Sequence, residues 1–228
     1  MSVSLKTPSG SNVTELDNTI IITKWLWDYE SFLEYQTYYQ QVVRESEKLK
    51  IFLICNHPHC FTLGRGNERG NSDLIDFPDE SLSNLDLPSY KIHRGGGITF
   101  HHPGQWIFYP IMKISPNYTL EDHMCWQLKL ISNTLRENFN LDYVVATKKT
   151  MGVWYQKKKV ASIGVGVKRF VTEHGIATNI LFDDRMKQAL SQINPCGLNS
   201  SVYTSLSEII SKQVSIDSFD SVIRGRLK

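Results

Sequence analysis

The pattern of hydrophobic and polar positions along the chain follows two periods, and the helical period predicts two long helices. Apolar side chains recur at helical spacing between residues 30 and 50, which predicts the first of them. Asp28 or Ser31 would cap its N-terminus, because a short polar side chain can accept the hydrogen bonds that the first turn leaves open. The apolar positions of this helix are Phe32, Tyr35, Tyr39 and Val42.

The second long helix is predicted over residues 119–139. Thr119 and Asp122 have the spacing of a capping box at its start. Cys125 flanks the apolar stripe of this helix, and we expect it in the core. The stripe consists of Leu120, Met124, Leu128, Ile131, Leu135 and Phe139.

Short apolar runs bounded by turn residues predict the strands. Pro110 indicates that its strand lies at a sheet edge or bulges there, since proline cannot donate to a ladder. Residues 66–89, rich in Asn, Asp, Ser and Pro, predict a long surface loop. Shorter helices are expected over 184–192, 205–211 and 216–227. The expected strands cover 19–25, 51–56, 90–94, 105–114, 141–146, 153–156, 160–167 and 175–181.

A largely antiparallel, mixed sheet flanked by helices places the chain in the α+β class. We expect one domain over residues 17–228, preceded by a flexible N-terminal extension over residues 1–16. No repeat or low-complexity segment divides the chain, and 41% hydrophobic with 21% charged residues is ordinary for a globular protein.

Charge and cysteine usage exclude several classes. A net charge of +2 gives no reason to expect binding to nucleic acid or to a membrane surface. The first residues lack the apolar core of a secretory signal, and the apolar runs are too short to span a bilayer. Four cysteines, unevenly spread, favour a reducing compartment, so we expect a cytoplasmic protein.

The segment 94–105 has the densest concentration of residues suited to a ligand site. Three successive glycines, Gly95, Gly96 and Gly97, let the backbone approach a ligand and turn several N–H groups toward one point. Glycines alone would equally fit a tight turn between strands. Thr99 and two histidines follow at once, and this crowding favours a site.

Cys196 lies between Pro195 and Gly197, which fix the backbone before it and free the backbone after it. A free cysteine is usually a small buried hydrophobe, so this one needs an activating partner before it counts as a nucleophile. Lys159 and His174 are the candidates. A lysine in a hairpin turn is more often solvated, however, and a single histidine is often structural.

Four ordered motifs together resemble the lipoyl(octanoyl) transferase family of lipoate biosynthesis, over about residues 19–210. The pair Lys159 and Cys196 distinguishes this family from the biotin and lipoate protein ligases, which share its fold. Asn56-His57-Pro58 with Thr62 and Gly64 is similar to the N-terminal motif of the family. The four motifs are Arg94-Gly95-Gly96 with Thr99, His101, Pro103 and Gly104; Lys159 with Ser162 and Gly164; His174-Gly175 with Ala177 and Asn179; and Pro195-Cys196-Gly197.

The resemblance implies the α+β catalytic domain of the lipoate and biotin ligases, without a cofactor, a metal or ATP. An octanoyl group would pass from acyl carrier protein to Cys196, with Lys159 handling the protons. The acceptors would be lysines of lipoyl domains in 2-oxoacid dehydrogenases and of the glycine cleavage H protein. The acyl and carrier-arm pocket would be lined by Arg94, Gly95, Gly96, Gly97, Ile98, Thr99, Phe100, His101, Ser162, Ile163, Gly164, His174, Gly175, Ile176 and Ala177.

Three positions, Asn56, His102 and Thr178, depart from the pattern of the family. They bear on the shape of the pocket and the preferred chain length, not on the class of reaction. Basic residues also gather between 148 and 169, and we interpret them as a basic rim that would attract acidic carrier domains. These residues are Lys148, Lys149, Lys157, Lys158, Lys168 and Arg169.

Three alternatives stay open. An ATP-dependent lipoate ligase would survive loss of Cys196, and a cysteine hydrolase would pair Cys196 with His174. A metal-binding module is weaker, because its cysteines and histidines do not have the spacing of a ligand motif. Its candidate ligands are Cys55, His57, His59, Cys60, His93, His101 and His102.

Overall fold

A large mixed sheet organises the molecule, which we describe from a computed structural model covering residues 5–66, 87–142, 144–145, 151–192 and 200–227. Its strand order is β1-β2-β3-β7-β11-β10-β9-β8, and every neighbouring pair is antiparallel except β2 with β3. The strands are β1 (Asn12–Leu16), β2 (Thr19–Lys24), β3 (Lys50–Cys55), β7 (Gln105–Ile111), β8 (Val144–Val145), β9 (Gly152–Tyr155), β10 (Lys158–Lys168) and β11 (Val171–Asn179).

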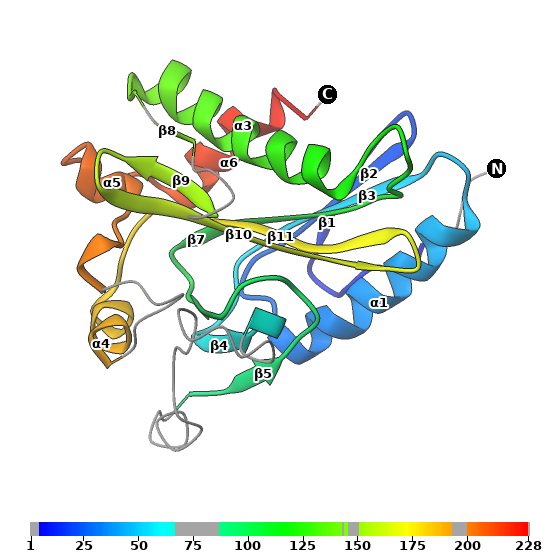
Figure 1. Ribbon diagram of the computed structural model, residues 1–228, viewed down its shortest axis with the longest axis horizontal. Helices are drawn as coiled ribbons and strands as arrows, with labels where there is room; N and C mark the ends of the chain where they lie inside the picture. Colours follow the sequence, from blue (N-terminus) through cyan, green and yellow to red (C-terminus); the bar gives the residue numbers. More distant parts are fainter. Residues whose placement is uncertain (1–4, 67–86, 143, 146–150, 193–199, 228) are drawn as a thin grey trace.

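A second, smaller sheet has the order β5-β4-β6, with β5 (Ser89–Lys91), β4 (Cys60–Leu63) and β6 (Ile98–His101). Helices cover the large sheet on both faces: α3 and α6 on one, and α1 on the other together with the small sheet (Figure 1). The predicted α+β architecture is confirmed. The helices are α1 (Tyr29–Glu45), α3 (Leu120–Phe139), α4 (Asp184–Gln192), α5 (Leu206–Ile209) and α6 (Ile216–Arg224), with a 3-10 turn η4 (Ser200–Val202).

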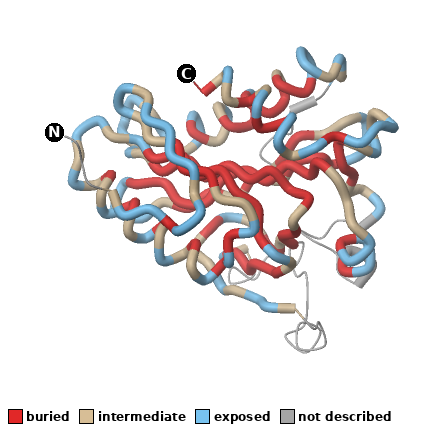
Figure 2. Tube along the Cα trace, turned by 180° about the vertical axis from the view of Figure 1, so that it is seen from behind, coloured by how far each residue is buried: buried red, intermediate tan, exposed pale blue. Residues whose placement is uncertain are grey.

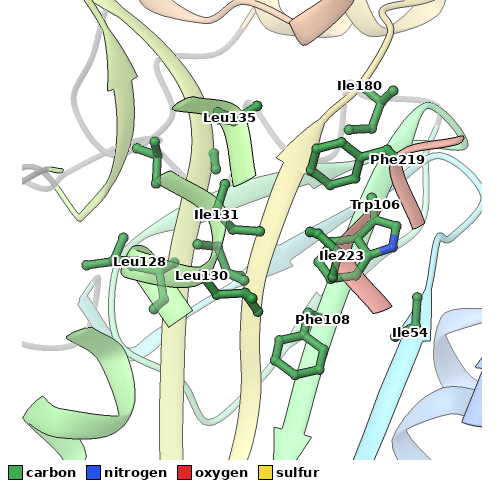
Figure 3. Packing of buried hydrophobic residues seen from close by; sticks show 14 of the residues in the cluster. Ile54, Trp106, Phe108, Leu128, Leu130, Ile131, Leu135, Ile180, Phe219 and Ile223 are labelled. Carbon is green, nitrogen blue, oxygen red and sulfur yellow. The ribbon is translucent and has the colours of Figure 1, made fainter. Parts of the chain in front are cut away.

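Buried residues run through the strands of the large sheet, whereas the outward sides of the helices are exposed (Figure 2). One hydrophobic cluster fills the space between the sheet and helices α3 and α6. There Leu128 and Ile131 of α3 and Phe219 of α6 pack over Trp106 and Phe108 of β7 (Figure 3). Burial of this apolar surface is the main force that holds the layers together.

The two long helices begin where their caps predict. Asp28 accepts a hydrogen bond from the backbone N–H of Ser31 at 3.0 Å, and Thr119 forms the predicted capping box with Asp122. The first helix ends at Glu45, five residues earlier than expected, because β3 begins at Lys50. None of the described helices is long and apolar enough to cross a membrane.

Three local expectations prove wrong. Cys125 is exposed, because it lies off the stripe of α3 that packs on the sheet. Residues 12–16, expected in a flexible extension, form strand β1, whose exposed side chains give no hydrophobic pattern. Pro110 lies in the central strand β7 rather than at an edge. The hydrogen-bonded ladder between β7 and β11 ends at Phe108, so Pro110 lies beyond it and its missing N–H costs no bond in that ladder.

Candidate active site

A narrow cavity lies between the large sheet and the glycine-rich segment 94–97. It encloses about 310 Å³ of empty space, part of it open to solvent. Strands β10 and β11, the glycine-rich segment with β6, and the start of α1 with β7 supply its walls. The lining residues are Tyr29, Arg94, Thr99, His101, Tyr109, Ser162, Ile163, Gly164, His174, Gly175 and Ala177.

Arg94 fixes the glycine-rich segment from within. Its Nη2 donates to the carbonyl oxygen of Thr62 and to the hydroxyls of Thr62 and Thr99, each at 2.9 Å. Its Nη1 donates to the carbonyl oxygen of Gly95 at 3.0 Å. The buried guanidinium therefore ties β4, β6 and the glycine-rich segment together and keeps its positive charge beside the cavity.

Close backbone approach explains the glycines of this region. A Cβ atom on Gly64 would lie 2.3 Å from the carbonyl oxygen of Gly96, which itself has a left-handed φ of 81°. A Cβ on Gly164 of β10 would lie 3.0 Å from Cδ of Arg94. The glycine-rich segment can therefore reach the sheet only where the facing residues lack side chains.

A β-bulge in β10 turns Lys159 toward the cavity side of the sheet. The register with β9 shifts between Lys159 and Ala161, so that Val160 is the extra residue. Val160 and Ala161 both pack in the hydrophobic cluster beneath α3. Because Val160 and Ala161 share one face, Lys159 and Ser162 both lie on the opposite face. Regular alternation would place Lys159 and Ser162 on different faces, since they are three residues apart.

Lys159 is only 2% exposed and lies among aromatic side chains. Its Nζ is 5.8 Å from the ring centroid of Trp154 and 6.0 Å from that of Tyr203. Its stem passes over Gly152, where a Cβ would come within 2.6 Å of Cε. The aromatic faces stabilise a charged ammonium that would otherwise be costly to bury.

A chain of buried polar groups connects the glycine-rich block with the strand of Lys159. Nδ1 of His101 donates to Oε1 of Gln105 at 3.0 Å, and Nε2 of Gln105 donates to Oδ1 of Asn179 at 3.0 Å. Asn179 donates to the carbonyl oxygen of Thr204 at 3.2 Å, and the N–H of Thr204 donates to that of Lys159 at 3.0 Å. This chain fixes both regions in one rigid frame.

His174 adopts a left-handed φ of 58° within β11. Its backbone N–H donates to Oε1 of Gln36 in α1 at 2.9 Å instead of to β7. Such a conformation is strained for a residue with a side chain, and here helix α1 supports it. The side chain is thereby directed into the cavity wall.

Tyr29 and Tyr109 also line the cavity, and sequence reasoning did not single them out. Tyr29, the first residue of α1, packs its ring 4.7 Å from that of His57. The hydroxyl of Tyr109 lies 3.3 Å from Nε2 of the same histidine. The motif similarity gave no signal for either tyrosine, because both reach the cavity only through the packing of α1 and β7 against the sheet.

Most of the residues expected in the pocket come together in this cavity. Gly95 and Gly96 line an adjoining hollow of about 970 Å³ instead. Gly97 lines neither space. Ile98, Phe100 and Ile176 are buried in hydrophobic clusters and also line neither space. Cys196 lies outside the described residues.

The three departures from the family pattern do not line the cavity. Oδ1 of Asn56 accepts a hydrogen bond from the N–H of Leu26 at 2.6 Å, and Nδ2 donates to the carbonyl oxygen of Pro103 at 2.6 Å. A carboxylate could not make the second bond. His102 and Thr178 are buried.

Three of the histidines considered as metal ligands have other partners. Nδ1 of His57 donates to the carbonyl oxygen of Trp27 at 2.6 Å. His59 pairs with Asp183 at 2.8 Å, and His93 pairs with Glu173 at 2.5 Å. Within the described ranges, no group of three or more His, Cys, Asp or Glu side chains could hold a metal ion.

The predicted basic rim does not form one patch. Lys157 and Lys158 lie at the start of β10, whereas Lys168 and Arg169 lie at its end. At about 3.3 Å per residue, the two pairs are about 30 Å apart. Only the first pair lies near Lys159. Lys148 and Lys149 are outside the described residues.

Burial lowers the pKa of several histidines, because the charged form loses its hydration. The pKa falls to about 4 for His57, His102 and His123, and to about 3 for His174. Burial also lowers the pKa of His101 well below its usual value. A histidine that stays neutral at pH 7 cannot balance a thiolate charge.

Comparison with solved structures identifies the fold. A candidate lipoate protein ligase from T. acidophilum, solved with bound lipoic acid, has a TM-score of 0.66 at 15% identity and covers 90% of this chain and 82% of its own. A lipoate-protein ligase A solved with bound ATP also has a TM-score of 0.66 at 15% identity, over 91% and 83% of the two chains. The fold is therefore that of the lipoate protein ligases, as predicted.

The sequence model of the family described as lipoyl protein ligase A/B catalytic domain matches residues 28–228. This chain belongs to that family.

Relatives that bear the name octanoyltransferase match most of the chain. The protein from Syntrophobacter fumaroxidans is 34% identical over 167 residues, 72% of this chain and 68% of the relative. The protein from Bdellovibrio bacteriovorus is 28% identical over 225 residues, 91% and 97% of the two. The family indicated by the four motifs is confirmed.

Stability should fall steeply as the pH drops from about 6.5 to 4. A histidine of the unfolded chain takes up a proton near pH 6.5, whereas His57, His102, His123 and His174 stay neutral in the fold until about pH 4 or below. The unfolded state thus binds more protons in this window. The free energy of unfolding should decrease by up to about 1.4 kcal/mol per pH unit for each histidine. Urea unfolding at several pH values measures this slope, and a flat response would contradict it.

Proposed function

We propose that this member of the family is an acyltransferase that moves an octanoyl group from acyl carrier protein, through a thioester on Cys196, to lysines of lipoyl domains. The acceptors are the lipoyl domains of 2-oxoacid dehydrogenases and the glycine cleavage H protein. The observation that carries the proposal is the buried ammonium of Lys159 on the same face of β10 as the cavity. A narrow cavity suits an unbranched hydrocarbon chain, and a buried ammonium nearby suits the proton transfers of the reaction.

In the first half-reaction, the Cys196 sulfur attacks the carbonyl carbon of the octanoyl thioester. A C–S bond to Cys196 forms, the C–S bond to the carrier arm breaks, and the proton of the Cys196 thiol ends on the departing arm thiol. In the second half-reaction, the amine of the acceptor lysine attacks the new thioester. An amide forms, and the amine proton returns to Cys196.

Lys159 is best suited to proton traffic in both steps. A cysteine with a pKa of about 8.5 is only about 3% thiolate at pH 7, but lowering that pKa to 7 would raise the rate only about threefold, because nucleophilicity falls with pKa. Stabilising the thiolate is therefore a small effect. Relaying protons between sulfur and nitrogen at the reacting centre has the larger effect on the rate.

We place the protein in the cytoplasm, where the donor and the acceptors would be present. The three described cysteines, Cys55, Cys60 and Cys125, are free thiols, which suits a reducing compartment. The fold is shared with ATP-dependent ligases, so exchange of pyrophosphate into ATP is the test that separates the two functions. A transferase should show none, whereas a ligase would show exchange that survives Cys196→Ser.

Cys196→Ser should abolish transfer while the protein stays folded. Incubation with octanoyl carrier protein should give an octanoyl adduct on Cys196 in the wild type, seen by mass spectrometry after proteolysis. The exposed Cys125 offers a matched control, because Cys125→Ser should keep both the adduct and the activity. Transfer by Cys196→Ser at near wild-type rate would refute the assignment of the nucleophile.

Lys159→Met should slow both half-reactions by about 10²–10⁴-fold, the usual contribution of a general acid–base group. Methionine has nearly the length of the lysine stem, so it should fill the space over Gly152. Single-turnover assays separate adduct formation from transfer to the acceptor. Lys168→Met, at an exposed position at the far end of β10, is the control. An effect confined to carrier binding would make Lys159 a docking residue instead.

Charge reversal should distinguish the two basic ends of β10. Lys157→Glu lies near the reactive end and should raise the KM for the acidic carrier severalfold at low salt, with the difference shrinking as salt screens the charges. Arg169→Glu, at the far end, should have little effect. Equal effects of both variants at every salt concentration would contradict docking at the reactive end.

A further inference from the structure

Two polar atoms in the cavity wall are buried without a hydrogen-bond partner: the hydroxyl of Tyr29 and Nδ1 of His174. The two residues are 2% and 3% exposed. Buried polar atoms are rarely left unpaired, because losing water without gaining a partner is costly. Two such atoms in one cavity indicate that something polar occupies that end of it.

Neighbouring residues hold both groups firmly in place. The Tyr29 ring packs 4.7 Å from the ring of His57 and 4.9 Å from that of Tyr90. The left-handed backbone of His174 is fixed by its bond to Gln36. Because neither side chain can easily turn to find a protein partner, the unpaired atoms are a property of the cavity.

Burial also fixes the protonation of both groups. It raises the pKa of the Tyr29 hydroxyl well above its usual value, so the group stays a neutral donor. Burial, followed by the charge of Arg94, lowers the pKa of His174 to about 3. The ring of Phe32 lies 5.4 Å from that of Tyr29 and 6.5 Å from that of His174, so both groups lie on the same side of the cavity.

The distance from the reactive end matches an eight-carbon chain. The stem of Lys159 passes over Gly152, which pairs with Ser162, whereas His174 pairs with Val165. Three residues along β10 correspond to about 10 Å. An extended eight-carbon chain has seven bonds and, at about 1.2 Å per bond as in an extended backbone, spans about 8–9 Å. Its methyl end would stop just short of His174.

We infer that the Tyr29 hydroxyl and the Nδ1 atom of His174 form a polar end wall that limits the length of the acyl chain. The inference rests on the proposed function. With an octanoyl group bound, a water bridging the two polar atoms satisfies them. A chain of ten or twelve carbons displaces that water and leaves both atoms against methylene groups, so the longer donor is disfavoured.

Tyr29→Phe tests the wall with little change of shape. The ratio of kcat/KM for decanoyl over octanoyl carrier protein should rise about five- to tenfold, because the hydroxyl no longer has to be desolvated. Tyr39→Phe is the matched control: its hydroxyl bonds to the carbonyl oxygen of Lys6 at 2.9 Å and lies outside the cavity lining, so the ratio should not change.

His174→Asn is the second variant, should Tyr29→Phe not fold. Asparagine tolerates a left-handed backbone and has a shorter side chain than histidine. The ratio of kcat/KM for decanoyl over octanoyl carrier protein should therefore rise in this variant as well. An unchanged ratio in a folded variant would overturn the inference. A uniform loss at every chain length would also overturn it, because it would put the hydroxyl at a group common to all donors.

Failure of the proposed function would look different. The wild type would then transfer no acyl chain of any length from the carrier. In that case the end wall is tested by calorimetric binding of free octanoate and dodecanoate to wild type and Tyr29→Phe. A selective gain for dodecanoate in the variant supports the wall, and equal affinities in both proteins would refute it.

Discussion

The site depends first on the guanidinium of Arg94. From one buried position it bonds to β4, β6 and the backbone of the glycine-rich segment, and so fixes three pieces of chain that share no ladder with the large sheet. Gly164 lets that assembly rest directly on β10. The cavity is the space left between these two rigid layers. Its shape is therefore set by backbone contacts more than by the side chains that line it.

Charge is distributed unevenly around this space. Lys159 lies outside the cavity lining and is buried among aromatic rings, whereas Arg94 lies in the lining among hydroxyls and carbonyl oxygens. The lining histidines His101 and His174 are neutral at pH 7 because they are buried. A largely neutral lining suits the hydrocarbon of a fatty chain, which needs no charge beside it.

Much of this could be predicted from sequence, for physical reasons that differ by element. Helix α3 was predictable because Thr119 and Asp122 cap an apolar stripe, so local rules determine it. The pocket residues were predictable because they fall in compact motifs. Tyr29 and Gln36 were not, since both reach the site only by the packing of α1 on the sheet. The burial of Lys159 also escaped prediction, because a bulge of one residue leaves no trace in hydrophobic periodicity.

The bulge at Val160 makes the chemistry of the site depend on the register of β10 as well as on the kinds of residue in it. A strand of the same length without the bulge would alternate regularly, which would put Lys159 on the same face as Ala161 and turn it toward the hydrophobic layer under α3. The reactive face would then lose its cation although every residue of the motifs remained. Straightening one strand would therefore turn an acyl-transferring site into a cavity that only holds a fatty chain.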